Sequence, residues 1–138
     1  MKKAFVDYRK AKEIAETYPT PFYLYDEEGI RETVRNLYKA FSWNEGYREY
    51  FAIKATPNPT ILRILKEEGC GVDCSSAAEL SLAEACGFSG SEIMFSSNDT
   101  PDEEYVFANR LHGIINLDDF SNIEEVSEIL GVLPKTMS

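Results

Sequence analysis

Short apolar segments and helix-forming segments alternate along most of this 138-residue chain, and this alternation most constrains its fold. Four apolar segments, each bounded by turn residues and too short for a typical helix, predict β-strands. They cover residues 50–53, 70–74, 92–95 and 113–117. A segment with helical signals follows each of them. Strands joined by helical crossovers run parallel, so the sequence predicts an α/β fold.

Capping residues mark the predicted helices. An asparagine before a proline and two S/T-x-x-E boxes indicate helix starts, while glycines indicate helix ends. The start signals are Asn58 with Pro59, Ser76 with Glu79, and Thr100 with Glu103; the end signals are Gly69, Gly87 and Gly131. Before these units, residues 7–18 and 27–41 predict two further helices. The aromatic segment 21–26 predicts a short strand.

Two architectures fit four parallel β/α units: an open doubly wound sheet and a (β/α)8 barrel. A complete barrel needs about 250 residues, so four units make about half of one. No G-x-G-x-x-G follows the first predicted strand, which weakens the case for a dinucleotide-binding sheet. We therefore predict part of a TIM (β/α)8 barrel, roughly the first half. Residues 1–26 lead into it, residues 27–138 form the partial barrel, and the chain is expected to be a piece of something longer.

Composition excludes several classes of partner. The formal net charge of -10 argues against nucleic acid and anionic membranes, which attract Lys and Arg patches. No apolar run approaches a membrane span, and the first residues lack the apolar core of a signal peptide. The three cysteines have no paired spacing, which predicts reduced thiols in a cytoplasmic protein. Too few Cys and His ligands are present for a metal site, so none is expected.

Polar residues follow the predicted strands at their carboxyl ends. Lys54 comes directly after the first strand, Asp73 lies near the end of the second, and Ser96 begins the polar stretch after the third. Asp118 and Asp119 follow the fourth strand. In parallel α/β architectures, functional residues lie at the carboxyl ends of the strands. These side chains are therefore expected to share one rim.

Lys54 has two interpretations on residue type alone. A lysine among apolar neighbours is poorly hydrated, which favours the neutral amine, and a neutral amine attacks carbonyl carbons. A neutral lysine of this kind is typical of enzymes that form a Schiff base. Alternatively, Lys54 extends into solvent and forms an ordinary ion pair with Asp73. Residue type leaves both open.

The segment around Lys54 resembles a known family. F-A-I-K-A-T-P-N-P-T-I-L-R-I-L, followed by G-C-G-V-D-C-S-S-A-A-E-L, resembles the signature of the fold type III (alanine-racemase-like) decarboxylases that depend on pyridoxal phosphate. That family includes the diaminopimelate, ornithine and carboxynorspermidine decarboxylases. T-P-F-Y-L-Y-D and I-I-N-L-D-D-F resemble two further family segments, so the likeness covers about residues 19–130.

The resemblance implies roles for four residues. Lys54 matches the lysine that binds pyridoxal 5'-phosphate covalently as an imine. Asp73 and Glu79 match acidic residues beside that lysine and the cofactor ring, and Ser96 matches a position beneath the cofactor. The capping box alone also explains Glu79, so both of its roles stay open. Thr100 stands where the family often has a lysine. The family's later histidine, phosphate-binding loop and catalytic cysteine have no counterpart in this chain.

The resemblance also implies a function. The expected reaction is decarboxylation of an amino acid, closest to the diaminopimelate decarboxylase of lysine biosynthesis, which converts meso-diaminopimelate to L-lysine and CO2. This chain is expected to be inactive alone. The alternatives are carboxynorspermidine, arginine or ornithine decarboxylase, a racemase of the same fold, or a non-catalytic cofactor-binding module. A half-barrel leaves two apolar strand edges unpaired, which predicts a homodimer or higher assembly.

Overall fold

A single parallel sheet organises the computed structural model, which describes residues 4–138. Its strands are β1 (Tyr50–Ala52), β2 (Gly71–Cys74), β3 (Ile93–Ser96) and β4 (Ile114–Asn116). They lie side by side in chain order and all pair in parallel. The order contains no reversal, whereas a doubly wound sheet reverses at its switch point. The prediction of barrel-type β/α units is therefore confirmed, and the doubly wound alternative is wrong.

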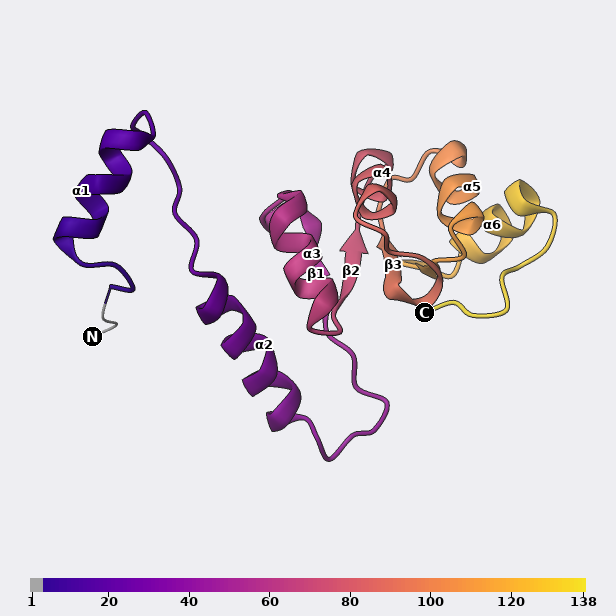
Figure 1. Cartoon of the computed structure of the whole chain (residues 1–138). Helices are drawn as coiled ribbons and strands as arrows, with labels where there is room; N and C mark the ends of the chain where they lie inside the picture. Colours follow the sequence, from indigo (N-terminus) through magenta and orange to yellow (C-terminus); the bar gives the residue numbers. More distant parts are fainter. Residues whose placement is uncertain (1–3) are drawn as a thin grey trace.

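Four helices cover one face of this sheet (Figure 1). They are α3 (Pro59–Glu67), α4 (Ala77–Ala85), α5 (Asp102–Arg110) and α6 (Asn122–Leu130). Two single turns of 3-10 helix, η1 (Ile53–Ala55) and η2 (Gly90–Glu92), lie after β1 and before β3. Within residues 4–138, no helix combines the length and apolar character that a bilayer span requires.

Side chains alternate between the two faces of each strand. On the helix-covered face, strand residues and helix residues form one buried core, which contains Val72, Cys74, Ile93, Phe95 and Ile115 from the strands and Leu62, Leu80, Ala108 and Val126 from the helices. We call the other side the open face. Its residues from the middle to the carboxyl ends of the strands are half-buried: Ala52, Asp73, Met94, Ser96, Ile114 and Asn116.

Two helices precede the sheet. α2 (Glu27–Ala40) packs on α3 through a second small core that includes Val34, Ile61 and Leu65. α1 (Tyr8–Thr17) has no buried residue and stands apart from the sheet in Figure 1.

Most predicted element boundaries are confirmed to within two residues. Asn58 caps α3, because its Oδ1 accepts from the backbone N–H of Thr60 at 2.9 Å. Ser76 caps α4 through the N–H of Glu79 at 3.3 Å. The three predicted terminating glycines all adopt positive φ, which Gly tolerates at a helix end: Gly69, Gly87 and Gly131.

Two local predictions are wrong, and a third finds no partner within the described chain. Residues 21–26 are extended but pair with no strand in the described chain, and Phe22, Tyr23 and Tyr25 are exposed. β propensity makes a strand only when a neighbour accepts its backbone hydrogen bonds. The first strand ends at Ala52, since Ile53 turns into η1. Thr100 forms no capping box, because α5 begins at Asp102 with Pro101 as an N-cap that has no side-chain bond.

Candidate active site at the carboxyl ends of the strands

The strand register brings several of the predicted rim residues together on the open face. Ala52, Asp73, Met94 and Ile114 form one continuous row across the sheet. Ser96 is the last residue of β3 and pairs with Asn116, the last residue of β4. Asp73 and Ser96 therefore project from the same side of neighbouring strands.

Lys54 lies beyond the end of β1, in the turn η1, which contacts β2. It is two residues past Ala52, whose partner in the register is Asp73. Lys54 is exposed and forms no ion pair with Asp73 or with any other carboxylate among residues 4–138. The ordinary ion pair that the sequence left open is absent, so the amine stays available.

The carboxylate of Asp73 contains a buried acceptor with no partner. Its Oδ1 is shielded from solvent and has no hydrogen bond within the described chain. Leaving a buried polar atom unpaired costs about 1–3 kcal/mol. Such a cost is offset when a ligand supplies a donor, so the end of β2 is suited to a ligand with an N–H or O–H group at this point.

Glu79 is occupied with its own chain. Its Oε2 accepts from the backbone N–H of Ser75 at 2.8 Å, and the Ser75 hydroxyl lies 3.3 Å from both carboxylate oxygens. In a standard capping box, that acceptor would face the N–H of Ser76. Glu79 thus fixes the turn between β2 and α4, and its role beside the cofactor stays a prediction.

The loops after β3 and β4 are joined by one hydrogen bond. Asn98 Nδ2 donates to Asp118 Oδ2 at 2.8 Å. Thr100, which follows in the first of these loops, has a buried hydroxyl oxygen without a partner. Sequence reasoning assigned no role to Asn98 or Asn116. The alternation I-I-N in β4 was the signal that could have placed Asn116 on the open face.

The three cysteines are buried thiols. Burial, reinforced by the charges of Glu79 and Asp73, raises the pKa of Cys74 to about 12. Burial also raises the pKa of Cys70 to about 11, and Cys86 is buried too. A thiol protonated at neutral pH does not attack. All three cysteines pack in the cores, Cys74 and Cys86 in the larger one and Cys70 in the smaller one.

Comparison with known proteins gives a consistent result. The family described as "Pyridoxal-dependent decarboxylase, pyridoxal binding domain" matches residues 27–135. Protein TabA of Pseudomonas amygdali pv. tabaci is 47% identical over 114 residues, which is 83% of this chain and 27% of TabA. The diaminopimelate decarboxylase of Methanothermobacter thermautotrophicus is 40% identical over 120 residues, which is 86% of this chain and 28% of that enzyme.

Solved structures share the fold. The diaminopimelate decarboxylase of "m. jannaschi" superposes with a TM-score of 0.76 at 31% identity, covering 88% of this chain and 30% of that one. The Helicobacter pylori enzyme complexed with L-lysine gives a TM-score of 0.75 at 28% identity, covering 90% of this chain and 32% of that one. The chain thus spans less than a third of each of these relatives.

Proposed function

Since the chain belongs to the family of pyridoxal-dependent decarboxylases, we propose that it is the part of an amino-acid decarboxylase that carries the cofactor lysine, Lys54. The observation that carries the proposal is the pairing of two features at one rim. An amine with no ionic partner lies beyond β1, and a buried acceptor with no partner lies at the end of β2.

These residues fit pyridoxal 5'-phosphate. The amine of Lys54 would hold the cofactor through its aldehyde carbon, and Asp73 Oδ1 would accept a hydrogen bond from an N–H of the bound group. Ser96 presents a hydroxyl on the same face. Glu79 would act through the turn that it fixes at Ser75. When bound, pyridoxal phosphate supplies an electron sink for the pair left as a carboxylate departs.

We further propose diaminopimelate as the substrate, with L-lysine and CO2 as products and lysine biosynthesis as the setting. Relatives of that name from several organisms support this choice. A chloroplast ornithine decarboxylase of Nicotiana glutinosa, 31% identical over 116 residues, makes ornithine the second candidate. Both are amino acids with a second amine, and a cytoplasmic location is part of the same proposal.

Trapping with borohydride tests the role of Lys54. The chain is mixed with pyridoxal phosphate, reduced, digested and analysed by mass spectrometry, because reduction converts an imine into a stable adduct. One dominant adduct at Lys54 is expected, and Lys54→Ala should abolish it. Lys39→Ala is the matched control, since Lys39 is exposed in the last turn of α2 and is not a residue of the rim. Adducts spread evenly over many lysines would refute the proposal.

The same assay tests Asp73 and the substrate. Asp73→Asn keeps the shape but removes the charge, and we expect it to reduce the Lys54 adduct while leaving thermal stability nearly unchanged. Adding meso-diaminopimelate before borohydride should lower the Lys54 adduct more than the same concentration of ornithine, because a recognised substrate takes the cofactor from the lysine. Equal effects of the two amino acids would remove the support for diaminopimelate.

We propose that the chain self-associates as a homodimer or higher assembly. The outer edge of β1 pairs with no strand in the described chain. Beside it, an apolar hollow of about 560 Å³ lies between α2 and the sheet and is lined by residues such as Leu24, Ile30, Val34 and Phe51. Unpaired edges and apolar hollows favour association. A monomer by light scattering at micromolar concentration would contradict this.

A further inference from the structure

The amino-terminal ends of the strands, opposite the candidate active site, contain a hollow of about 290 Å³. Ser91, just before β3, and His112, just before β4, line it together with Asn109 at the end of α5. Lys135 and Thr136 also line it, directly before Met137, which pairs with Ile115 of β4. The apolar part of the lining comes from Gly113, Ile114 and Pro134. Three successive segments of the β/α repeat thus converge on one site.

The lining is cationic and rich in donors. Lys135 offers an ammonium group, His112 a ring N–H in either protonation state, Asn109 an amide, and Ser91 and Thr136 hydroxyls. Within residues 4–138, no Asp or Glu lines the hollow, although the chain has a formal net charge of -10. Lys135 makes no ion pair in this part of the chain. This charge pattern is opposite to that of the whole molecule.

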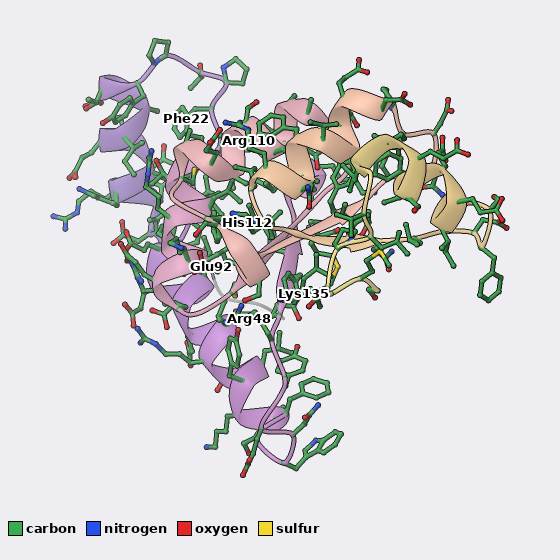
Figure 2. All side chains as sticks on the ribbon, turned by 90° about the vertical axis from the view of Figure 1, so that its right-hand side faces the viewer. Phe22, Arg48, Glu92, Arg110, His112 and Lys135 are labelled. Atoms are coloured by element: carbon green, nitrogen blue, oxygen red, sulfur yellow. The ribbon has the colours of Figure 1, made fainter. Side chains whose placement is uncertain are left out.

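A second cation, Arg48, is fixed at the border of the hollow. Arg48 Nη1 donates to the carbonyl oxygen of Ser91 at 3.0 Å and lies 3.4 Å from its hydroxyl. Figure 2 shows Arg48, His112 and Lys135 in the same part of the molecule. Glu92, next to Ser91, accepts from Lys66 at 2.6 Å, and its carboxylate also interacts with the charge of Arg48. Lys135 is therefore the cation of the hollow whose charge no ion pair within residues 4–138 neutralises.

We infer that this hollow binds a small oxyanion of the phosphate class, either inorganic phosphate or a phosphate monoester. Phosphate oxygens accept from all the donors that line the site, and a charged acceptor strengthens each bond. The volume is at the lower end of the range for small-ligand sites. The hollow lies at the amino ends of the strands and Lys54 lies at the carboxyl ends, so the inference is independent of the proposed function.

Inorganic phosphate is the first probe. The 138-residue chain, labelled with nitrogen-15, is titrated with phosphate at constant ionic strength maintained with chloride, and amide shifts are followed by NMR. We expect saturable shifts at residues 109–113 and 134–136, with a Kd on the order of 1 mM for so small a ligand. The Lys54→Ala variant should give the same result, which separates this site from the cofactor lysine.

Variants assign the binding to the hollow. Lys135→Gln should weaken phosphate binding about tenfold, since it removes a charge-assisted bond. His112→Asn should also weaken it, and asparagine tolerates the positive φ of 57° at this position. Lys12→Gln is the matched control, because Lys12 is an exposed residue of α1 and the substitution removes the same charge. Its affinity for phosphate should be unchanged.

Three outcomes would overturn the inference. The first is the absence of saturable shifts at residues 109–113 and 134–136. The second is equal weakening by Lys135→Gln and Lys12→Gln, which indicates a general charge effect. The third is that both hollow variants lower Tm without phosphate and leave the phosphate-induced shifts unchanged, as expected if Lys135 and His112 only interact with the carbonyl end of α5. A second titration with ethyl phosphate identifies the source: tighter binding than phosphate indicates a monoester, and equal binding indicates free phosphate.

Discussion

The two faces of β3 show how one strand serves two purposes. Ile93 and Phe95 point to the helix-covered face and are almost completely buried. Met94 and Ser96, which alternate with them, lie half-buried on the open face. β2 repeats the pattern, with Val72 and Cys74 in the core and the unpartnered carboxylate of Asp73 on the open face. Packing energy is concentrated on one face, which leaves polar groups on the other available for chemistry.

Phe95→Ala should strongly destabilise the core on the helix-covered face. The ring is 1% exposed and packs edge-on against Tyr105, with the ring centroids 6.3 Å apart. Removing a buried phenyl group costs about 3–5 kcal/mol. Its neighbour Ser96→Ala, on the open face, should cost less than about 1 kcal/mol. Urea unfolding of the two variants measures the contrast, and similar losses would show that the faces are not energetically distinct.

Gly71→Ala should destabilise the amino end of the open face. A Cβ atom at Gly71 would lie 2.6 Å from the ring of Tyr50 and 2.7 Å from the carbonyl oxygen of Glu92. The Tyr50 ring is held there because its hydroxyl donates to Ser91 O at 2.7 Å. Overpacking of this kind costs about 1–3 kcal/mol.

A second substitution tests whether the Tyr50 ring is the cause. Tyr50→Ala, added to Gly71→Ala, removes the ring contact and keeps the backbone contact at Glu92. Thermal unfolding of the double variant should show that part of the lost stability returns, relative to Tyr50→Ala alone. If Gly71→Ala unfolds at the same temperature as the wild type, the amino end of the open face has room for the added Cβ atom, and the predicted overpacking is absent.

Glu104→Ala should weaken a bond between neighbouring helices on the covered side. Glu104 Oε1 accepts from the backbone N–H of Ala77, the first residue of α4, at 2.8 Å. Losing an N-terminal acceptor costs about 1 kcal/mol. Glu103→Ala is the matched control, because both carboxylates lie in the first turn of α5 and interact equally with its dipole. Chemical unfolding should separate the two variants; identical values would assign the whole effect to the dipole.

Low pH should remove a smaller stabilising contribution, that of the ion pair between Lys66 of α3 and Glu92, which directly precedes β3. Burial raises the pKa of Glu92, but the hydrogen bonds from Lys66 and the Ser89 N–H outweigh it, so its pKa falls below 4.5. A carboxyl group whose pKa is lowered by folding stabilises the protein above its unfolded pKa and loses that contribution as pH falls through the folded one. Tm measured against pH should show wild type above Glu92→Gln at pH 7 and the gap closing below pH 4.5. A gap independent of pH would contradict this.

Local signals in the sequence predicted most of the secondary structure. Asn58, Ser76 and the three terminating glycines identified helix ends because capping depends on residues within one turn. The same reasoning failed at Thr100, where the carboxylate expected to cap its own helix was not used, and neighbouring Glu104 caps α4 instead. That bond joins residues 27 positions apart, which no local pattern encodes.

The site was predictable in part. Lys54, Asp73 and Ser96 were identified as rim residues because the period of two and the parallel topology place strand ends together. The roles of these residues remain predictions. Asn116 and the Asn98–Asp118 bond were missed, since loop side chains meet only after the strands are aligned. The missing ion pair at Lys54 likewise depends on the turn η1, which replaced the last residue of the predicted strand.

The sequence by itself determined the alternation of strands and helices, which residues of each strand share a face, and the family signature around Lys54. These properties follow from short-range periodicity and capping. Only the tertiary structure decided that the sheet is wound in one direction, that the aromatic segment 21–26 stays unpaired, and that Asp73 retains a buried acceptor without a partner. Such properties depend on which distant groups come into contact, and hydrogen bonding and burial are settled only by those contacts.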